Sequence, residues 1–145
     1  MVQLHKSTGL RWRTYRYIEG IIQDLDIYET MINKRTTELL TPYIKHDENI
    51  GGGKSSLTTN PTEQSANALA EDGELNQLVK EYEAATNEIK KMLPEHRKVI
   101  EMAYMKKPKT LTWQGIALEC NYSTKHCYWI RDQLIIKIAK KLQMR

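Results

Sequence analysis

Residues 112–142 read TWQGIALECNYSTKHCYWIRDQLIIKIAKKL, and this stretch decides the fold of the chain. Thr112 precedes a helical pattern, where its hydroxyl can accept a hydrogen bond from a free backbone N–H. Asn121 tolerates the left-handed conformation of a tight turn, and Ser123 can cap a following helix. Apolar residues recur at helical spacing on both sides of this turn: Trp113, Ile116, Ala117 and Cys120, then Cys127, Ile130, Leu134, Ile138 and Leu142. The stretch therefore predicts two helices joined by a short turn.

Such a pair is typical of a helix-turn-helix, in which the second helix enters the major groove of DNA. Ala117 supplies the small side chain that two steeply crossing helices need at their contact. With Cys127 and Ile130 turned inward, the first turns of the second helix keep an outer face. An ordinary helical hairpin is the alternative, but spacing, turn chemistry and charge together favour DNA binding. The predicted DNA-binding residues are Lys106, Lys107, Lys109, Gln114, Ser123, Thr124, Lys125, His126, Tyr128, Trp129, Arg131 and Asp132.

The net charge of +4 conceals an uneven distribution. From Pro94 to Arg145 there are 11 Lys and Arg against 4 Asp and Glu, a net charge of +7. The first 93 residues hold 11 basic and 14 acidic residues, a net charge of −3. A polyanion is therefore attracted to the C-terminal third. The three lysines around Pro108 suit contact with a phosphate backbone, although a solvated loop is the alternative.

The N-terminal helical region is predicted to span residues 1–42, with a loose start over residues 1–8. One amphipathic helix is expected from Leu10 to Leu25, and a second over residues 27–40 that Thr41-Pro42 ends. Arginines lie among the aromatic residues of the first helix. The interpretation we favour for them is a solvated face that pairs with acidic groups, and nucleic-acid contact is the alternative. The groups concerned are Arg11, Arg13 and Arg16, with Asp24, Asp26 and Glu29 as acidic partners.

Three further regions follow, so the predicted fold class is all-α. Residues 43–61 are predicted to be a Gly/Ser-rich linker. Residues 62–93 are predicted to form a long middle helix, open to interruption near Asp72-Gly73. Residues 94–145 are predicted to be the helix-turn-helix domain, whose opening helix runs from Pro94 to about Met105. Four residues of this helix are expected to pack on the helix-turn-helix: Val99, Ile100, Ala103 and Tyr104.

The middle helix carries an apolar stripe that has two interpretations. It fits a coiled-coil seam between two chains, or it packs against the N-terminal helices of the same chain. A homodimer is favoured because a single helix-turn-helix reads few base pairs. The stripe consists of Leu75, Leu78, Tyr82, Ala85, Ile89 and Met92.

No residue pattern indicates catalysis, so we expect a protein that is not an enzyme, with no cofactor and no bound metal. The four histidines are dispersed, and neither HExxH nor CxxC occurs. Gly53-Lys54-Ser55 is like the end of a phosphate-binding loop, but Glu48 stands where that loop needs glycine. His126 and Cys127 are adjacent on a helix and point about 100° apart, which disfavours a thiol–imidazole pair.

Cysteine usage and hydropathy predict a cytoplasmic protein. Cys120 and Cys127 are seven residues apart on packed faces, which favours buried thiols over a disulfide. No run of about 18 apolar residues and no secretory signal pattern occurs, so no membrane partner is expected.

The segment from Leu93-Pro94-Glu95 through Leu142 resembles region 4 of bacterial sigma factors, with Asn121 where that family usually has glycine. It also has Thr124 and Tyr128 where arginines are common. Nearly the whole chain is similar to phage transcriptional activators of the RinA type. The shared string is Thr41-Pro42, then Asp47 and Asn49-Ile50-Gly51-Gly52. The resemblance implies a phage or prophage activator of late packaging and structural genes that binds DNA and assists the host RNA polymerase. It also implies that the glycine string does more than link.

A DNA-packaging recognition subunit, similar to a small terminase, is the alternative function, because it uses the same helix-turn-helix. It predicts a ring of eight or more copies and a motor ATPase as partner. The activator hypothesis predicts binding to a promoter that weakens with salt. If about five cationic groups meet phosphates, log K should fall with log salt at a slope of roughly −4 to −5.

Overall fold

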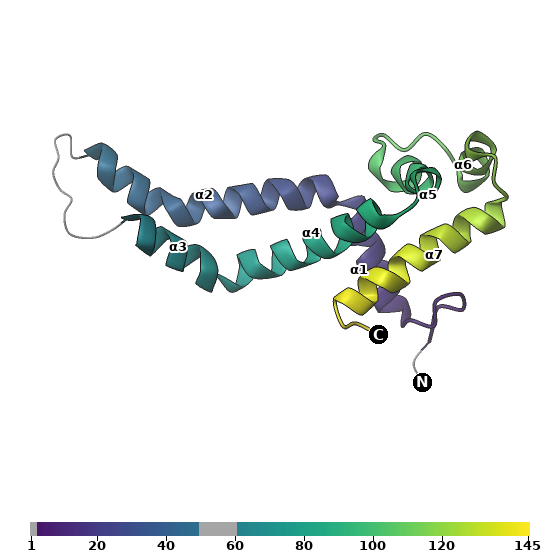
Figure 1. Cartoon of the computed structure of the whole chain (residues 1–145), viewed down its shortest axis with the longest axis horizontal. Coiled ribbons are helices and arrows are strands. Elements are labelled where there is room, and N and C mark those ends of the chain that lie inside the picture. Colours follow the sequence, from purple (N-terminus) through teal and green to yellow (C-terminus); the bar gives the residue numbers. More distant parts are fainter. Residues whose placement is uncertain (1–2, 50–60) are drawn as a thin grey trace. The chain divides into compact units, whose positions relative to one another are not determined.

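The structure is a computed structural model that describes residues 3–49 and 61–145, and in these ranges it consists of helices joined by turns. The all-α prediction is confirmed for this part of the chain, where one isolated bridge between Leu4 and Arg11 is the sole β contact. The same residues include no helix with the length and apolar character needed to cross a lipid bilayer. The elements (Figure 1) are α1 (Trp12–Gln23), α2 (Leu25–Asn49), α3 (Pro61–Glu71), α4 (Gly73–Lys91), α5 (Pro94–Ile100), the π-helical turn η1 (Glu101–Met105), α6 (Trp113–Cys120) and α7 (Thr124–Lys141).

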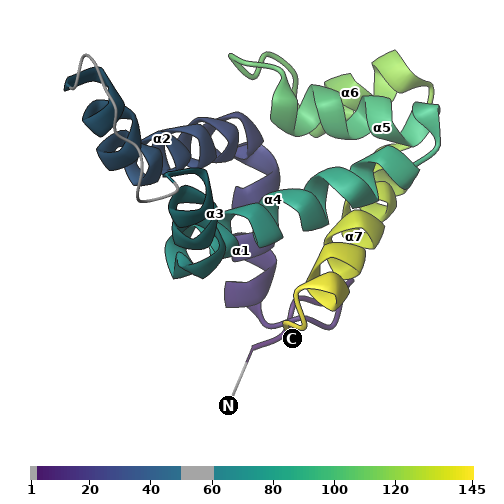
Figure 2. The ribbon, with the colours of Figure 1, turned by 60° about the vertical axis from the view of Figure 1, so that its left-hand side comes forward.

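The chain forms two compact units, and the first combines both ends of the sequence. The first unit comprises Met1–Leu25 and Glu81–Arg145, and the second comprises Asp26–Lys80. In the first unit α1 lies against α7, although the two helices come from opposite ends of the chain (Figure 2). The N-terminal helix therefore belongs with the C-terminal helices, a grouping that does not follow the region boundaries predicted from sequence.

Apolar residues at helical spacing form the core of the first unit. The α1 prediction is confirmed within two residues at each end, and of the five expected apolar positions inside the helix all but Trp12 are buried. The helix after Pro94 is also confirmed, with its last turn widened into η1. Because each helix turns one stripe inward, the buried positions meet in one core. Its largest fully buried side chains are Ile18, Ile21, Ile22, Val99, Ile100, Ile116, Cys127, Ile130, Leu134, Ile135 and Ile138.

Residues 3–11 form a closed turn, which we call the N-terminal hook, so the predicted loose start is wrong for residues 3–8. The N–H of His5 donates to the carbonyl of Leu10 at 2.7 Å, and the N–H of Gly9 donates to the carbonyl of His5 at 2.8 Å. Gly9 has φ +73°, a conformation that glycine adopts without steric cost. The ring of His5 stacks on Tyr15 with centroids 3.9 Å apart, and His5 is 8% exposed. This stacking fixes the hook to α1.

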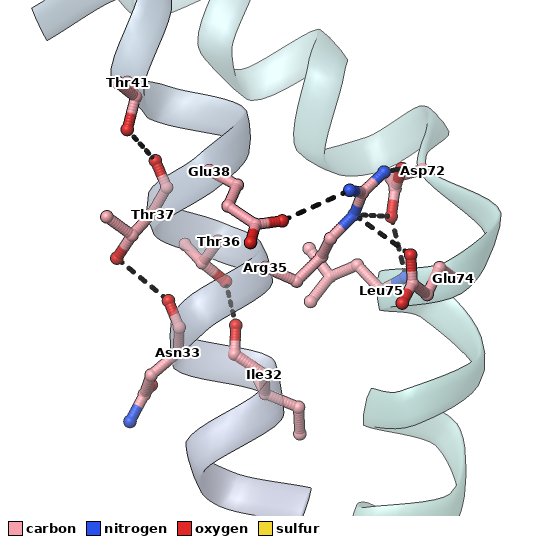
Figure 3. Close-up of polar contacts among 10 residues, drawn as sticks. All are labelled: Ile32, Asn33, Arg35, Thr36, Thr37, Glu38, Thr41, Asp72, Glu74 and Leu75. Carbon is pink, nitrogen blue, oxygen red and sulfur yellow. Dashed lines mark hydrogen bonds and ion pairs between the residues drawn. The ribbon is translucent and has the colours of Figure 1, made fainter.

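In the second unit, α2 continues to Asn49, so the prediction that Thr41-Pro42 ends this helix is wrong. Proline lacks one N–H, but its fixed φ near −65° is itself helical, so a helix can continue through it at a cost of about 3 kcal/mol. The hydroxyls of Thr36, Thr37 and Thr41 donate to carbonyls one turn earlier, so these side chains do not cap a new turn (Figure 3). Of the predicted linker, residues 43–49 are helical and residues 50–60, with the glycine string, lie outside the described residues.

The predicted middle helix is interrupted at Asp72, where α3 ends and α4 begins. The Asp72 carboxylate accepts a hydrogen bond from the N–H of Leu75 at 2.8 Å, which caps the start of α4. It also accepts two from Arg35 on α2, at 2.7 and 3.1 Å (Figure 3). This bidentate pair ties α2 to the junction of α3 and α4 within the second unit.

The pair predicts an acid-sensitive junction. The Arg35 guanidinium, followed by the Leu75 N–H, holds the pKa of Asp72 below its ordinary value of 3.8. A carboxyl group whose pKa is lower in the folded than in the unfolded state stabilises the fold at pH values above its ordinary pKa. This contribution is lost as the pH falls through the lowered pKa of the folded state. We expect the hydrogen-exchange protection of the Leu75 amide to fall as the pH drops below 3.8, the ordinary pKa of this carboxyl group. In Asp72→Asn it should be lower at pH 5 and nearly independent of pH. Equal pH profiles for the two proteins would contradict the role of this carboxylate.

The apolar stripe of α4 is partly buried within the single chain. Leu75, Ala85 and Ile89 are buried, the last with 6% of its surface exposed, whereas the other three positions are half-buried. These burials favour packing within the chain over a continuous coiled-coil seam. The homodimer stays a prediction.

Candidate nucleic-acid interface

Helices α6 and α7 are joined by the turn Asn121-Tyr122-Ser123, and its predicted local chemistry is confirmed. The Thr112 hydroxyl accepts a hydrogen bond from the N–H of Gly115 at 3.1 Å. The Ser123 hydroxyl accepts one from the N–H of His126 at 3.0 Å. Asn121 has φ 59° and ψ 37°, in the left-handed region. The next N–H, from Tyr122, donates to the carbonyl of Ala117 at 3.0 Å. This is the Schellman arrangement that ends many helices.

The left-handed Asn121 predicts a graded series of variants. Asn121→Ala should lower the free energy of unfolding by about 1 kcal/mol, because a side chain with Cβ and no local polar group disfavours this conformation. Asn121→Gly should match or exceed the wild type, since glycine adopts positive φ freely. Urea denaturation measures both, with Glu119→Ala, an exposed change in α6, as the control. If alanine were tolerated as well as glycine, the turn would have a different conformation.

The first turns of α7 expose an outer face above buried anchors. Cys127 and Ile130 are fully buried, whereas Lys125 is exposed and Trp129 is 50% exposed. Helical geometry explains this, because residues two positions apart lie on opposite sides of the helix. Three further residues of the predicted set, Thr124, His126 and Tyr128, are half-buried, and Ser123 is exposed.

The segment before α6 adds exposed polar and positive groups. Lys106, Lys107 and Lys109 are exposed in the loop between η1 and α6, and Gln114 is exposed in the first turn of α6. The Lys109 ammonium lies 5.9 Å from the ring centroid of Trp113. Because Trp113 is 5.4 Å from Tyr128 by ring centroids, this ammonium lies beside the first turns of α7. The loop and α7 therefore share one surface.

Arg131 and Asp132 were predicted to contact DNA, but in the structure Arg131 is half-buried, Asp132 is buried, and both make contacts within the fold. Asp132 is 4% exposed, and its carboxylate accepts a hydrogen bond from Nε of Arg131 at 2.9 Å. The Arg131 guanidinium lies 4.7 Å from the ring of Tyr128, 5.4 Å from that of Trp113 and 5.7 Å from that of Tyr15. A guanidinium held by three aromatic faces and a carboxylate supports the fold. The Tyr15 contact could not be inferred locally, because α1 is distant in sequence.

A second aromatic cluster, formed by residues of α5 and α7, was not predicted from the sequence. The rings of His126 and Trp129 are stacked with centroids 5.5 Å apart. His96 approaches both of them edge-on, at 5.8 and 6.2 Å. The three-residue spacing of His126 and Trp129 in one helix was a usable indication, since such residues share a face. His96 lies in a different helix, α5, so no spacing along α7 indicates its contact with these two rings. These contacts hold the orientation of the exposed Trp129 ring.

The two cysteines of the chain, Cys120 and Cys127, lie in α6 and α7. Both cysteines are free thiols, as predicted, and burial followed by the nearby Cys120 raises the pKa of the Cys127 thiol. A raised pKa keeps the thiol protonated and unreactive at neutral pH. In the described ranges no three His, Cys, Asp or Glu side chains are grouped to hold a metal ion.

Comparison with known proteins covers nearly the whole chain. A family model described as "Protein of unknown function (DUF722)" matches residues 16–140. A protein of Staphylococcus phage phi11 with the name "Transcriptional activator rinA" is similar at 23% identity over 137 residues, which are 94% of this chain and 96% of the phage protein. No solved structure matches the chain. The residues matched by the family model include α1 from Arg16 onward and nearly all of α7, so this match extends over both parts of the first unit.

Proposed function

We propose that this chain, which belongs to the family described as "Protein of unknown function (DUF722)", is a regulator of transcription that binds double-stranded DNA through α6 and α7. In this proposal α6, the turn and α7 act as a helix-turn-helix similar to sigma-factor region 4. The observation that carries it is the exposed face of α7 at Lys125 and Trp129 above the buried Cys127 and Ile130.

Charge supports the same surface. Residues 94–145 have a net charge of +7, and four exposed lysines lie on the loop before α6 and the first turn of α7. Ammonium groups in such positions contact phosphates and fix the orientation of a recognition helix. Lys125 and Trp129 then extend toward base edges, where lysine donates to guanine and an aromatic ring packs on a thymine methyl.

The name of the phage relative supports activation of transcription over repression. That protein is called a transcriptional activator, and it aligns with nearly all of this chain. We therefore propose that the chain activates late phage or prophage genes, with a host RNA polymerase as its second partner. An oligomer of two chains would provide two helix-turn-helix units for a palindromic site. The chain would then act in the cytoplasm of the bacterial host.

A salt titration on DNA fragments from the gene's own neighbourhood tests the proposal. With the three loop lysines on phosphates, log K should fall with log salt at a slope of about −2.7. One fragment should bind more tightly than scrambled DNA of the same length. A flat salt response, or equal affinity for every fragment, would contradict sequence-specific regulation. Light scattering in the same buffer should report a dimer, whereas a ring of eight or more copies would favour the DNA-packaging alternative.

A further inference from the structure

The N-terminal hook and the first turns of α1 carry a concentration of positive charge that the fold does not use. Lys6, Arg11, Arg13 and Arg16 are all exposed. Among the residues that the structure describes, none forms an ion pair with Lys6, Arg11 or Arg13. The Arg16 guanidinium lies 5.5 Å from the ring of Trp12, which is itself 40% exposed. We call these four residues the hook cations.

Other arginines of the chain have evident structural contacts. Arg35 pairs with Asp72, and Arg131 is held by three rings and Asp132. Arg97 donates to the carbonyls of Ile89, Lys90 and Met92, and so closes the end of α4. The hook cations have no comparable contact with the protein. The expected pairing of Arg11, Arg13 and Arg16 with acidic groups is not among the ion pairs of the described residues.

The position of these cations is also unfavourable for the helix itself. Arg11 precedes α1, Arg13 and Arg16 lie in its first turns, and no acidic residue occurs in the first turn. The N-terminal end of a helix carries partial positive charge, so cations there repel it. These cations do not stabilise the helix, and their presence is explained if an anion of another molecule neutralises their charge.

Side-chain contacts connect the hook to the surface proposed to meet DNA. His5 in the hook stacks on Tyr15 at 3.9 Å, and Tyr15 is 5.7 Å from the Arg131 guanidinium. That guanidinium is 5.4 Å from the ring of Trp113, over which the Lys109 ammonium lies at 5.9 Å. All these residues belong to the first unit. An unbroken series of side-chain contacts within the first unit therefore links the hook to Trp113 and Lys109.

We propose that the hook cations form a second contact for the same DNA duplex, on phosphates that flank the groove entered by α7. The inference rests on the proposed function, since it extends the same surface. A duplex presents one negative charge per about 1.7 Å along its axis, so a bound duplex that continues past the loop lysines offers phosphates to the hook. The exposed ring of Trp12 lies beside Arg16, where it can pack on the sugar-phosphate backbone.

The test compares the salt dependence of DNA binding in matched double variants. If Arg11 and Arg13 each neutralise a phosphate in addition to the three loop lysines, wild-type binding should have a slope near −4.5 and not near −2.7. Arg11→Gln with Arg13→Gln should then make the slope less steep by about 1.8. Lys34→Gln with Lys80→Gln removes the same charge from exposed positions of the second unit and should leave the slope unchanged. Arg11→Lys with Arg13→Lys keeps the charge and should retain the wild-type slope.

The outcomes separate this inference from the proposed function. If the wild type shows a salt-dependent slope and the Arg11→Gln, Arg13→Gln protein keeps it, the hook is not a contact, although the DNA-binding proposal survives. If both glutamine variants lower the slope equally, the effect is one of overall charge and the inference is overturned. A salt-independent wild type would overturn both proposals. Urea denaturation of each variant shows whether it is folded before its affinity is interpreted.

Discussion

Arg131→Ala is expected to lower the free energy of unfolding of the first unit by about 3–5 kcal/mol, the usual result when one member of a buried ion pair is removed. The Asp132 carboxylate would be left buried at 4% exposure without its guanidinium partner. Three aromatic rings would also lose the cation that they surround. Chemical denaturation followed by circular dichroism measures the change.

Two comparison proteins make the Arg131 result specific. Lys137→Ala, an exposed change on the same helix, should stay within about 0.5 kcal/mol of the wild type. Arg131→Met combined with Asp132→Leu replaces the pair with apolar groups and should recover much of the lost stability. If Arg131→Ala instead kept wild-type stability and lost only DNA binding, Arg131 would be a DNA contact, as its position in the sequence first suggested.

Changes on the exposed surface should separate affinity for particular sequences from affinity for any DNA. Lys125→Ala should reduce the ratio of specific to nonspecific binding by about 5- to 150-fold, the range expected for the loss of one good base contact. Replacing Lys106, Lys107 and Lys109 with glutamine should weaken binding to all sequences and reduce the salt slope by about 2.7. Competition titrations with specific and scrambled fragments measure both quantities.

The two lysine variants are also each other's controls. Both change exposed residues, so their stabilities should match that of the wild type within about 0.5 kcal/mol. If Lys125→Ala weakened binding to specific and scrambled DNA equally, Lys125 would contact phosphate only. The assignment of base recognition to the first turns of α7 would then be wrong for this residue.

Local chemistry explains why the turn between α6 and α7 could be predicted from sequence. Thr112, Asn121 and Ser123 act on backbone groups within a few residues of themselves, so their roles depend little on the rest of the fold. The inward positions Cys127 and Ile130 follow from the helical repeat alone.

Contacts between distant segments explain what the sequence did not reveal. Asp132 lies on a face that periodicity leaves open, and its burial accompanies the packing of α1 against α7. His5 is buried because it stacks on Tyr15, which no spacing rule anticipates. The continuation of α2 past Pro42 also differs from the local expectation that proline ends a helix. That expectation reflects a cost of about 3 kcal/mol, which other interactions of the helix can offset.

Lysine acetylation footprinting, read by mass spectrometry with and without bound DNA, shows whether one exposed surface, formed by the loop before α6 and the first turns of α7, meets the duplex. We expect bound DNA to protect Lys106, Lys107, Lys109 and Lys125, while Lys34 and Lys80 in the second unit stay fully reactive. Protection of Lys34 and Lys80 with Lys125 still reactive in the complex would contradict this expectation.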